Sequence, residues 1–263
     1  MINVTKAKAL FRRSLSIMIE YRIQTIIWML VGIEPIIMMF IWMELAKNGA
    51  VGGYSASEFA SYFLTAFFVR QMTVVWVVWD LDREIRLGDL SPKLLKPIDP
   101  YWEHVIENLA EKLIRFPLVV VPLAIGFWLT GASLPLTIIG ILLFILALIG
   151  AWTLRFNEQY DYGLISFWTQ SSTGIEGVMW AIYYVFSGAI IPIKLMPKAI
   201  ADIVYLTPFP YMIDFPTQII LGKLSSQEIS KGFMILTIWI VFLLVARQLL
   251  WKYGIKRYGA TGA

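Results

Sequence analysis

The sequence predicts an all-α polytopic membrane protein, and three observations lead to this fold class. The chain has 263 residues, of which 59% are hydrophobic and only 15% are charged, whereas a soluble domain carries close to 25% charged residues. The mean hydropathy is +0.71, and apolar stretches long enough to cross a bilayer recur along the chain. Lysines and arginines collect in alternate connections between these stretches. An ordinary water-soluble fold is therefore excluded.

Residues 1–22 are predicted to form an amphipathic helix in the plane of the membrane interface. At 100° per residue, apolar and small side chains between Ala7 and Tyr21 share one side of the helix. The opposite side is polar and mostly basic, with Lys6, Lys8, Arg12, Arg13, Ser16 and Glu20. Charges run through the whole stretch, which excludes a signal peptide. A basic amphipathic helix beside a span favours the interface, and packing on another subunit is the alternative.

Six transmembrane helices follow, and one membrane domain accounts for the whole chain. The expected spans are residues 23–45, 58–79, 113–129, 134–154, 164–191 and 233–250. Pro117 and Pro122 are expected to kink the third span. With six spans, one side of the membrane receives sixteen of the 22 lysines and arginines and the other side receives five, with Arg70 inside the second span. Because basic loops stay in the cytoplasm, both termini, including the tail 251–263, are predicted to be cytoplasmic.

The cytoplasmic connection 81–112 is too long for a turn and too charged to enter lipid. Gly88 and Asp89 are suited to end one helix, and Ser91-Pro92 is suited to open another with serine as the N-cap. Leu94 and Leu95 add a small apolar surface, and Pro97 and Pro100 stop this helix within about two turns. We expect a short helix that docks on a soluble partner, and a merely solvated loop is the alternative.

The outer connection 192–232 is largely apolar, yet prolines interrupt it too often for a continuous spanning helix. Two short helices, Met196–Leu206 and Tyr211–Leu221, are expected to dip into the outer leaflet and return, which requires protein to cover their ends. An ordinary folded outer loop is the alternative.

Three ionisable residues are expected at membrane depth: Glu34, Arg70 and Glu176. Each costs a few kcal/mol or more in lipid, so each is expected to face the bundle interior, a partner or water. The arginine and two glutamates are expected to form a neutralised cluster with one spare acid. This cluster either lines a route for cationic or zwitterionic amphiphiles or holds helices in register, and the sequence leaves both open.

Several kinds of chemistry have no support in the sequence. There is no cysteine and one histidine, His104, which we interpret as a polar residue at headgroup level without a catalytic partner or metal motif. No catalytic residue, metal site or nucleic-acid site is predicted. The phosphate-binding pattern is absent, and Gly222-Lys223-Leu224 fails its final position. If ATP hydrolysis drives the protein, the ATPase is therefore another chain.

The order of these features resembles the ABC-2 type of ABC exporter permease along essentially the whole chain. It is closest to a bacterial branch of six-span permeases, on several short motifs taken together. These are Gly88-Asp89-Leu90 with Leu94-Leu95-Lys96-Pro97-Ile98, Ser166-Phe167-Trp168, Ser187-Gly188-Ala189-Ile190-Ile191-Pro192 with Met196-Pro197, Thr207-Pro208-Phe209-Pro210-Tyr211, and Pro216 to Gly222.

The resemblance implies a permease in the bacterial inner membrane that exports an amphiphilic drug, lipid or glycan-like substrate. It implies two ATP-binding cassette subunits, which bind the ATP and Mg, and a second permease, identical or related. The residues implied to couple to the ATPase are Gly88, Asp89, Ser91, Leu94, Leu95, Lys96 and Pro97, and those implied at the outer gate are Pro192, Pro197, Pro208, Phe209 and Pro210. A self-contained secondary transporter or channel is the main alternative, and a membrane enzyme acting on lipid is a weaker one.

Overall fold

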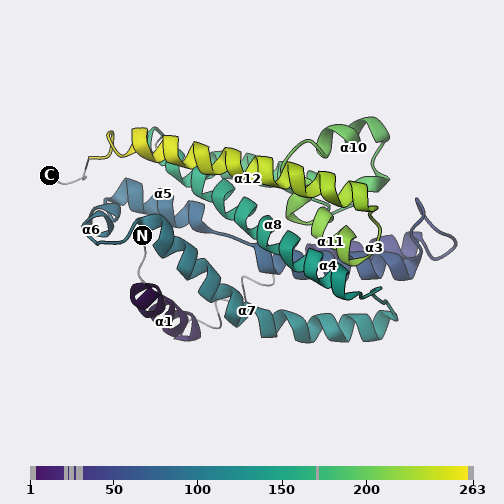
Figure 1. Ribbon diagram of the computed structural model, residues 1–263. Coiled ribbons are helices and arrows are strands. Elements are labelled where there is room, and N and C mark those ends of the chain that lie inside the picture. The colour runs from purple at the N-terminus through teal and green to yellow at the C-terminus, as the bar shows by residue number, and fades with distance from the viewer. Residues whose placement is uncertain (1–3, 21–22, 24–26, 28–31, 170–171, 260–263) are drawn as a thin grey trace.

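The computed structural model describes residues 4–20, 23, 27, 32–169 and 172–259 (Figure 1). This part of the chain is helical and contains no strand, which confirms the all-α class. Its longest helices are α7 (Pro100–Thr130), α8 (Ile138–Leu164) and α12 (Ser226–Gly254), which run along the length of the molecule (Figure 1).

Helix α8 lies at the centre of the bundle. It contacts α12, α4 (Ala56–Thr73), α5 (Val77–Leu87) and α11 (Asp214–Ile220). Its buried apolar positions include two alanines, Ala147 and Ala151, and such small side chains let neighbouring helices approach closely. The apolar windows of α7 and α12 are only 11% and 17% buried, against 83% for residues 56–87. The outer helices therefore present apolar surface to lipid, while α4 is enclosed by protein.

Four helical segments among the described residues are long and apolar enough to cross a membrane. They are Ala56–Leu87, Pro100–Thr130, Ile138–Phe167 and Ser226–Gly254. They contain the second, third and sixth predicted spans and all of the fourth except residues 134–137. The first predicted span is described mainly through α3 (Glu34–Leu45), and most of its earlier residues lie outside the described part of the chain.

The fifth predicted span, 164–191, is not one helix. Helix α8 continues to Leu164, a 3₁₀ turn covers Ile165–Phe167, and α9 (Thr173–Phe186) is only 14 residues long. Such a helix rises about 21 Å, less than the roughly 30 Å hydrocarbon core. The serines before α9 are bound by the carboxylate of Asp82, and side-chain hydrogen bonds of this kind compete with helical ones.

The second predicted span contains a break. Helix α4 ends at Thr73 and α5 begins at Val77. The carbonyl of Val74, freed by this break, accepts a hydrogen bond from the ammonium of Lys112 on α7. The break is therefore compensated inside the bundle, as irregular backbone at membrane depth requires.

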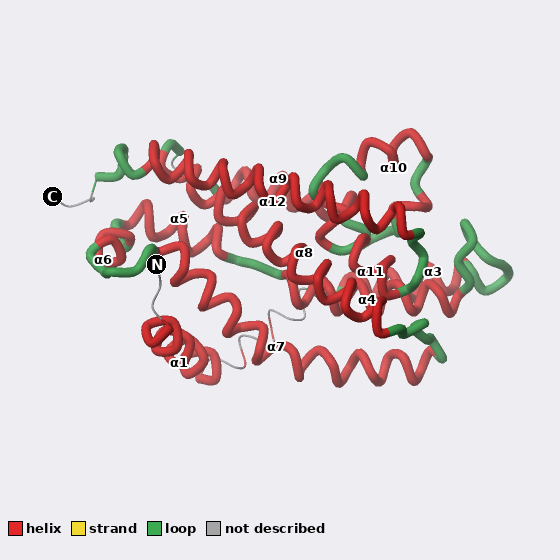
Figure 2. Tube along the Cα trace, in the orientation of Figure 1, coloured by secondary structure: helices red, strands yellow, loops and turns green. Residues whose placement is uncertain are grey.

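Helix α7 contains both Pro117 and Pro122 and remains one helix. It changes direction along its length (Figure 2), which is the bend expected of internal prolines.

The two ends of the bundle carry different elements (Figures 1 and 2). Helix α6 (Leu90–Leu94), helix α1 (Val4–Glu20) and the end of α12 lie toward one end, which we call the α6 end. Helix α10 (Lys198–Val204) lies at the opposite end, the α10 end. Helix α1 packs against α7.

Candidate functional site

The loop at the α6 end presents two leucines to solvent. Gly88 ends α5 with φ +84°, a left-handed conformation that favours glycine. Leu90, the first residue of α6, is completely buried, whereas Leu95 is 88% exposed and Leu94 is 38% exposed. The buried Leu90 thus anchors the loop, while the side chains of Leu94 and Leu95 are exposed on its surface.

The predicted N-cap of this helix is wrong. Helix α6 begins at Leu90, one residue before Ser91, and has no side-chain cap. The hydroxyl of Ser91 instead lies 2.9 Å from the hydroxyl of Tyr258, near the C-terminus. Because this long-range hydrogen bond uses the serine hydroxyl, Ser91 joins α6 to the tail instead of capping it.

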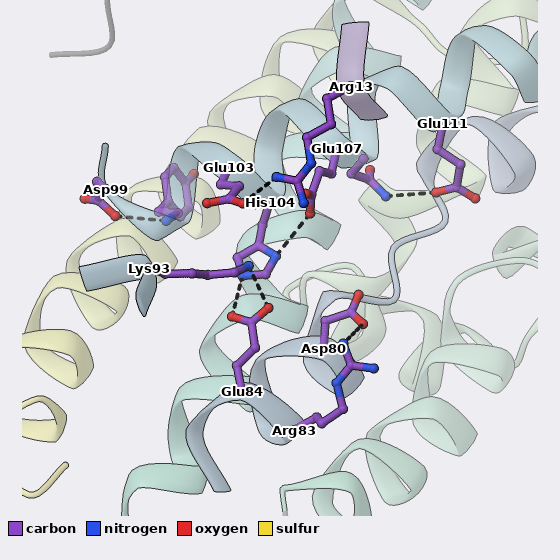
Figure 3. Close-up of polar contacts among 12 residues, drawn as sticks. Arg13, Asp80, Arg83, Glu84, Lys93, Asp99, Glu103, His104, Glu107 and Glu111 are labelled. Atoms are coloured by element: carbon purple, nitrogen blue, oxygen red, sulfur yellow. Dashed lines mark hydrogen bonds and ion pairs between the residues drawn. The ribbon is translucent and has the colours of Figure 1, made fainter. Parts of the chain in front are cut away.

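Glu84 of α5 connects α6 to α7 (Figure 3). Its carboxylate lies 2.7 Å from the ammonium of Lys93 on α6 and 3.3 Å from Nε2 of His104 on α7. Our interpretation of His104 as a headgroup-level residue is wrong, because the residue is only 3% exposed and lies between α5 and α7. The pair was not predicted because Glu84 and His104 are 20 residues apart in the chain.

Glu103 connects helix α1 to the same loop (Figure 3). Its carboxylate lies 3.6 Å from the guanidinium of Arg13 on α1 and 3.3 Å from the ammonium of Lys96. Glu103 is buried on α7, so its ion pairs hold Arg13 and Lys96 against this helix. Helices α1, α5, α6 and α7 therefore form one ion-paired unit at this end.

The predicted intramembrane cluster is in fact two separate groups. Glu34 of α3 forms an ion pair with Arg70 of α4. Tyr184 of α9 bridges them: its hydroxyl accepts a hydrogen bond from Arg70 at 2.7 Å and donates one to Glu34. This group is neutral and joins three helices.

Glu176 lies apart from that pair, beside Arg155 and Gln159 of α8. Arg155, counted in the sequence among cytoplasmic loop cations, is buried, stacks over the ring of Tyr183 at 4.3 Å and pairs with Glu158. The expectation of one cluster is corrected, because Glu176 lies with Arg155 and Glu158 and not with Glu34 and Arg70. Glu176, only 6% exposed, forms no ion pair with a described residue.

A third polar group at the break between α4 and α5 was missed by the sequence prediction. Arg115 of α7 is fully buried, donates a hydrogen bond to Gln71 of α4 at 2.7 Å and pairs with Glu111. Lys112 binds the free carbonyl of Val74. The signal was the spacing of Glu111 and Arg115, which places acid and base one helical turn apart, but both were assigned to the edge of a loop.

The segment 192–232, which we call the outer segment, folds into short helices and turns before α12 begins. They are the 3₁₀ turns Ile193–Leu195 and Phe209–Met212 and the helices α10 and α11. The proline-rich positions Pro192, Pro197, Pro208, Phe209 and Pro210 lie before or within these elements.

Asp214 organises this outer segment, although no sequence pattern pointed to it. Its fully buried carboxylate accepts hydrogen bonds from Tyr62 of α4 at 2.8 Å, Gln218 at 3.2 Å and Tyr205 at 3.3 Å. Its backbone N–H donates to the carbonyl of Ser187, after α9, at 2.9 Å. The outer segment is thereby attached to both α4 and α9.

In the described part of the chain, no three His, Asp or Glu side chains are grouped so that they could hold a metal ion. The clusters above are ion pairs and neutral hydrogen bonds between helices. They can hold helices together and line a polar route, but they show no arrangement of nucleophile and base.

Comparison with known proteins gives one family. The sequence model of a family described as ABC-2 family transporter protein matches residues 26–262. No curated protein matches the chain. The match begins within the first predicted span and includes every cluster described above except the Arg13 contact of α1.

Proposed function

The chain belongs to the ABC-2 family of transporters, and from this premise we propose that it is the permease subunit of an ATP-driven exporter. The family makes it a membrane-spanning subunit of an ABC transporter that is not itself an ATPase. The finer proposal is that two ATP-binding cassette subunits dock at the α6 end and hydrolyse ATP with Mg. The substrate is then expelled at the α10 end, across a bacterial inner membrane with both chain termini in the cytoplasm.

The observation that carries this proposal is the pair of outward leucines on a loop that is otherwise held firmly. Leu95 is 88% exposed beside the 38% exposed Leu94, and together they offer an apolar surface that a partner can cover. The ion pairs of Glu84 and Glu103 tie this loop to α5, α7 and α1. A displacement of α6 would therefore be transmitted through these ion pairs to α5 and α7.

The outer segment is proposed as the gate. Asp214 attaches α11 to α4 and α9, two helices that also carry Arg70 and Tyr184. A change in the distance between α4 and α9 would thus move α11 and the outer segment at the α10 end. The substrate is proposed to be an amphiphile, and the carboxylate of Glu176, which lacks an ion pair among the described residues, supports a cationic or zwitterionic one. A second permease, identical or related, is proposed to complete the pathway.

A mild-detergent pull-down of the tagged protein, with ATPase activity assayed on the recovered material, tests the proposal. We expect a nucleotide-binding subunit to co-purify, and we expect the double substitution Leu94→Glu, Leu95→Glu to abolish its recovery. Leu136→Glu is the matched control, because Leu136 is 59% exposed in the connection between α7 and α8 at the other end of the bundle. Its recovery of the ATPase is expected to be unchanged.

The opposite result would favour the alternative. An intact oligomer that lacks any ATPase and moves substrate into liposomes along an ion gradient would identify a self-contained secondary transporter or channel.

A further inference from the structure

A pocket of about 380 Å³ lies at the α10 end among α10, α11 and α12. Figures 1 and 2 place α10 beside the N-terminal part of α12. The indole N–H of Trp239 on α12 donates to the carbonyl of Leu206, just after α10, at 3.0 Å and joins the two elements. The volume falls in the range of small-molecule sites.

The rim of this pocket carries charges of both signs. Lys194 and Glu228 face each other at 3.6 Å. Asp202 of α10 and Lys231 of α12 also line the pocket, and neither forms an ion pair with any residue that the structure describes. The pocket therefore offers one carboxylate and one ammonium that protein has not neutralised.

The polar groups at the floor of the pocket already form hydrogen bonds within the protein. The carboxylate of Asp214 accepts the hydroxyl of Tyr205, and the hydroxyl of Tyr211 donates to the carbonyl of Tyr205 at 2.8 Å. These groups need no ligand to complete their hydrogen bonds. Recognition of a bound molecule is consequently assigned to the rim charges.

The walls are apolar and continue onto a lipid-facing surface. Leu206, Phe215 and Ile235 line the pocket. Further along α12, Ile238 and Phe242 are each 58% exposed. A molecule with its polar part at the rim would therefore find apolar surface for a long hydrocarbon tail.

We propose that this pocket binds the headgroup of a zwitterionic phospholipid. The phosphate is placed against Lys231, the cationic group against Asp202, and the acyl chains along α12. Both unpaired charges are thereby neutralised by one ligand, since charge-assisted contacts of this kind are the stronger ones. The proposal requires only that the chain lie in a membrane, and it stands whether or not the protein exports anything.

Native mass spectrometry of the purified full-length protein, with its co-purifying subunits, tests the site. The probes are phosphatidylethanolamine and phosphatidylglycerol with identical acyl chains. We expect the zwitterionic lipid to bind about tenfold more tightly, as one charge-assisted contact would give. Asp202→Asn is expected to remove this preference, Asp202→Lys to reverse it, and Lys231→Gln to weaken both lipids. Lys198→Gln, an exposed residue of α10 outside the pocket, is the control and is expected to change neither.

Three results would overturn the assignment. They are equal affinities for the two lipids, a preference that survives both Asp202 substitutions, and full competition by water-soluble phosphoethanolamine at the concentration of the lipid. The last would show that the acyl chains contribute nothing. Asp202 is exposed, so correct folding of its variants is expected and is checked by elution volume and thermal unfolding.

Discussion

The carboxylate of Asp82 on α5 accepts a hydrogen bond from the backbone N–H of Ser172, immediately before α9, at 2.8 Å. The same oxygen accepts the hydroxyl of Ser166 at 2.6 Å. Helix α5 also carries Glu84, which binds Lys93 of α6. One helix thus contacts both the exposed loop at the α6 end and the start of α9. Contacts made by α5 therefore run from α6 to the start of α9.

Asp82→Ala is expected to lower the free energy of unfolding by about 2 kcal/mol, because it leaves the buried N–H of Ser172 without its acceptor. Asp82→Asn keeps an acceptor oxygen and is expected to lose less. Thermal unfolding in detergent measures the stability, and ATP-driven transport measures the coupling. The control is Asp80→Ala, since Asp80 is half-exposed and forms only a long pair with Arg83 at 3.8 Å. Equal effects of the two alanine variants would contradict this role of Asp82.

Glu34→Gln and Arg70→Gln are each expected to destabilise the protein by about 3 to 5 kcal/mol, because each leaves an uncompensated charge in the bundle. The double variant is expected to be more stable than either single variant, since it removes both charges together. A double-mutant cycle on thermal stability provides the measurement. Strictly additive losses would mean that the pair contributes nothing as a pair. Altered substrate selectivity in a stable double variant would add a role in the pathway.

Glu158→Gln and Glu176→Gln are expected to differ, although both carboxylates lie near Arg155. Glu158 forms the ion pair, so its neutralisation leaves Arg155 unpaired and is expected to reduce the yield of folded protein. Glu176 forms no ion pair with a described residue, so its neutralisation is expected to change the preference among cationic and neutral substrates while the yield is retained. Size-exclusion chromatography and competition transport assays separate the two effects. Loss of folded protein alone in the Glu176 variant would assign it a structural role.

The long apolar helices and the helical class were predictable because they depend on composition and local spacing. Four of the six expected spans lie in helices of sufficient length. The fifth predicted span is not one helix. Mean hydropathy over a window of residues contains no information about long-range contacts, so it could not predict this interruption. Asp82, on another helix, accepts hydrogen bonds from Ser166 and Ser172, which lie within this predicted span. Likewise the break after Thr73 depends on Lys112, about forty residues away.

The polar clusters were only partly predictable for the same reason. The cost of burying charge correctly indicated that Glu34 and Arg70 need partners, and they are partners of each other. It could not indicate that Glu176 belongs with Arg155, because the apparent end of the span at Leu154 placed that arginine in a loop. The role of Asp214 could not be predicted from the sequence, since its hydrogen-bond partners Tyr62 and Tyr205 come from separate segments.

The stability of the outer segment is expected to depend on pH through Asp214. Burial raises the pKa of its carboxyl above the ordinary value of 3.8. A raised pKa in the folded state means that folding favours the protonated form, so stability is fully present below 3.8 and is lost as the pH rises through the folded-state pKa. The titratable neighbours Tyr54, Tyr205 and Tyr211 have raised pKa values and stay neutral in this range.

Asp214→Asn should therefore become progressively more stable relative to the wild type as the pH rises above 3.8. The asparagine oxygen can still accept from Tyr62 and Gln218, and its amide can donate to the hydroxyl of Tyr205. The difference in unfolding temperature between the two proteins, followed across this range, isolates Asp214 from every other titrating group. A constant difference would show that the carboxylate of Asp214 is equally well accommodated in both protonation states.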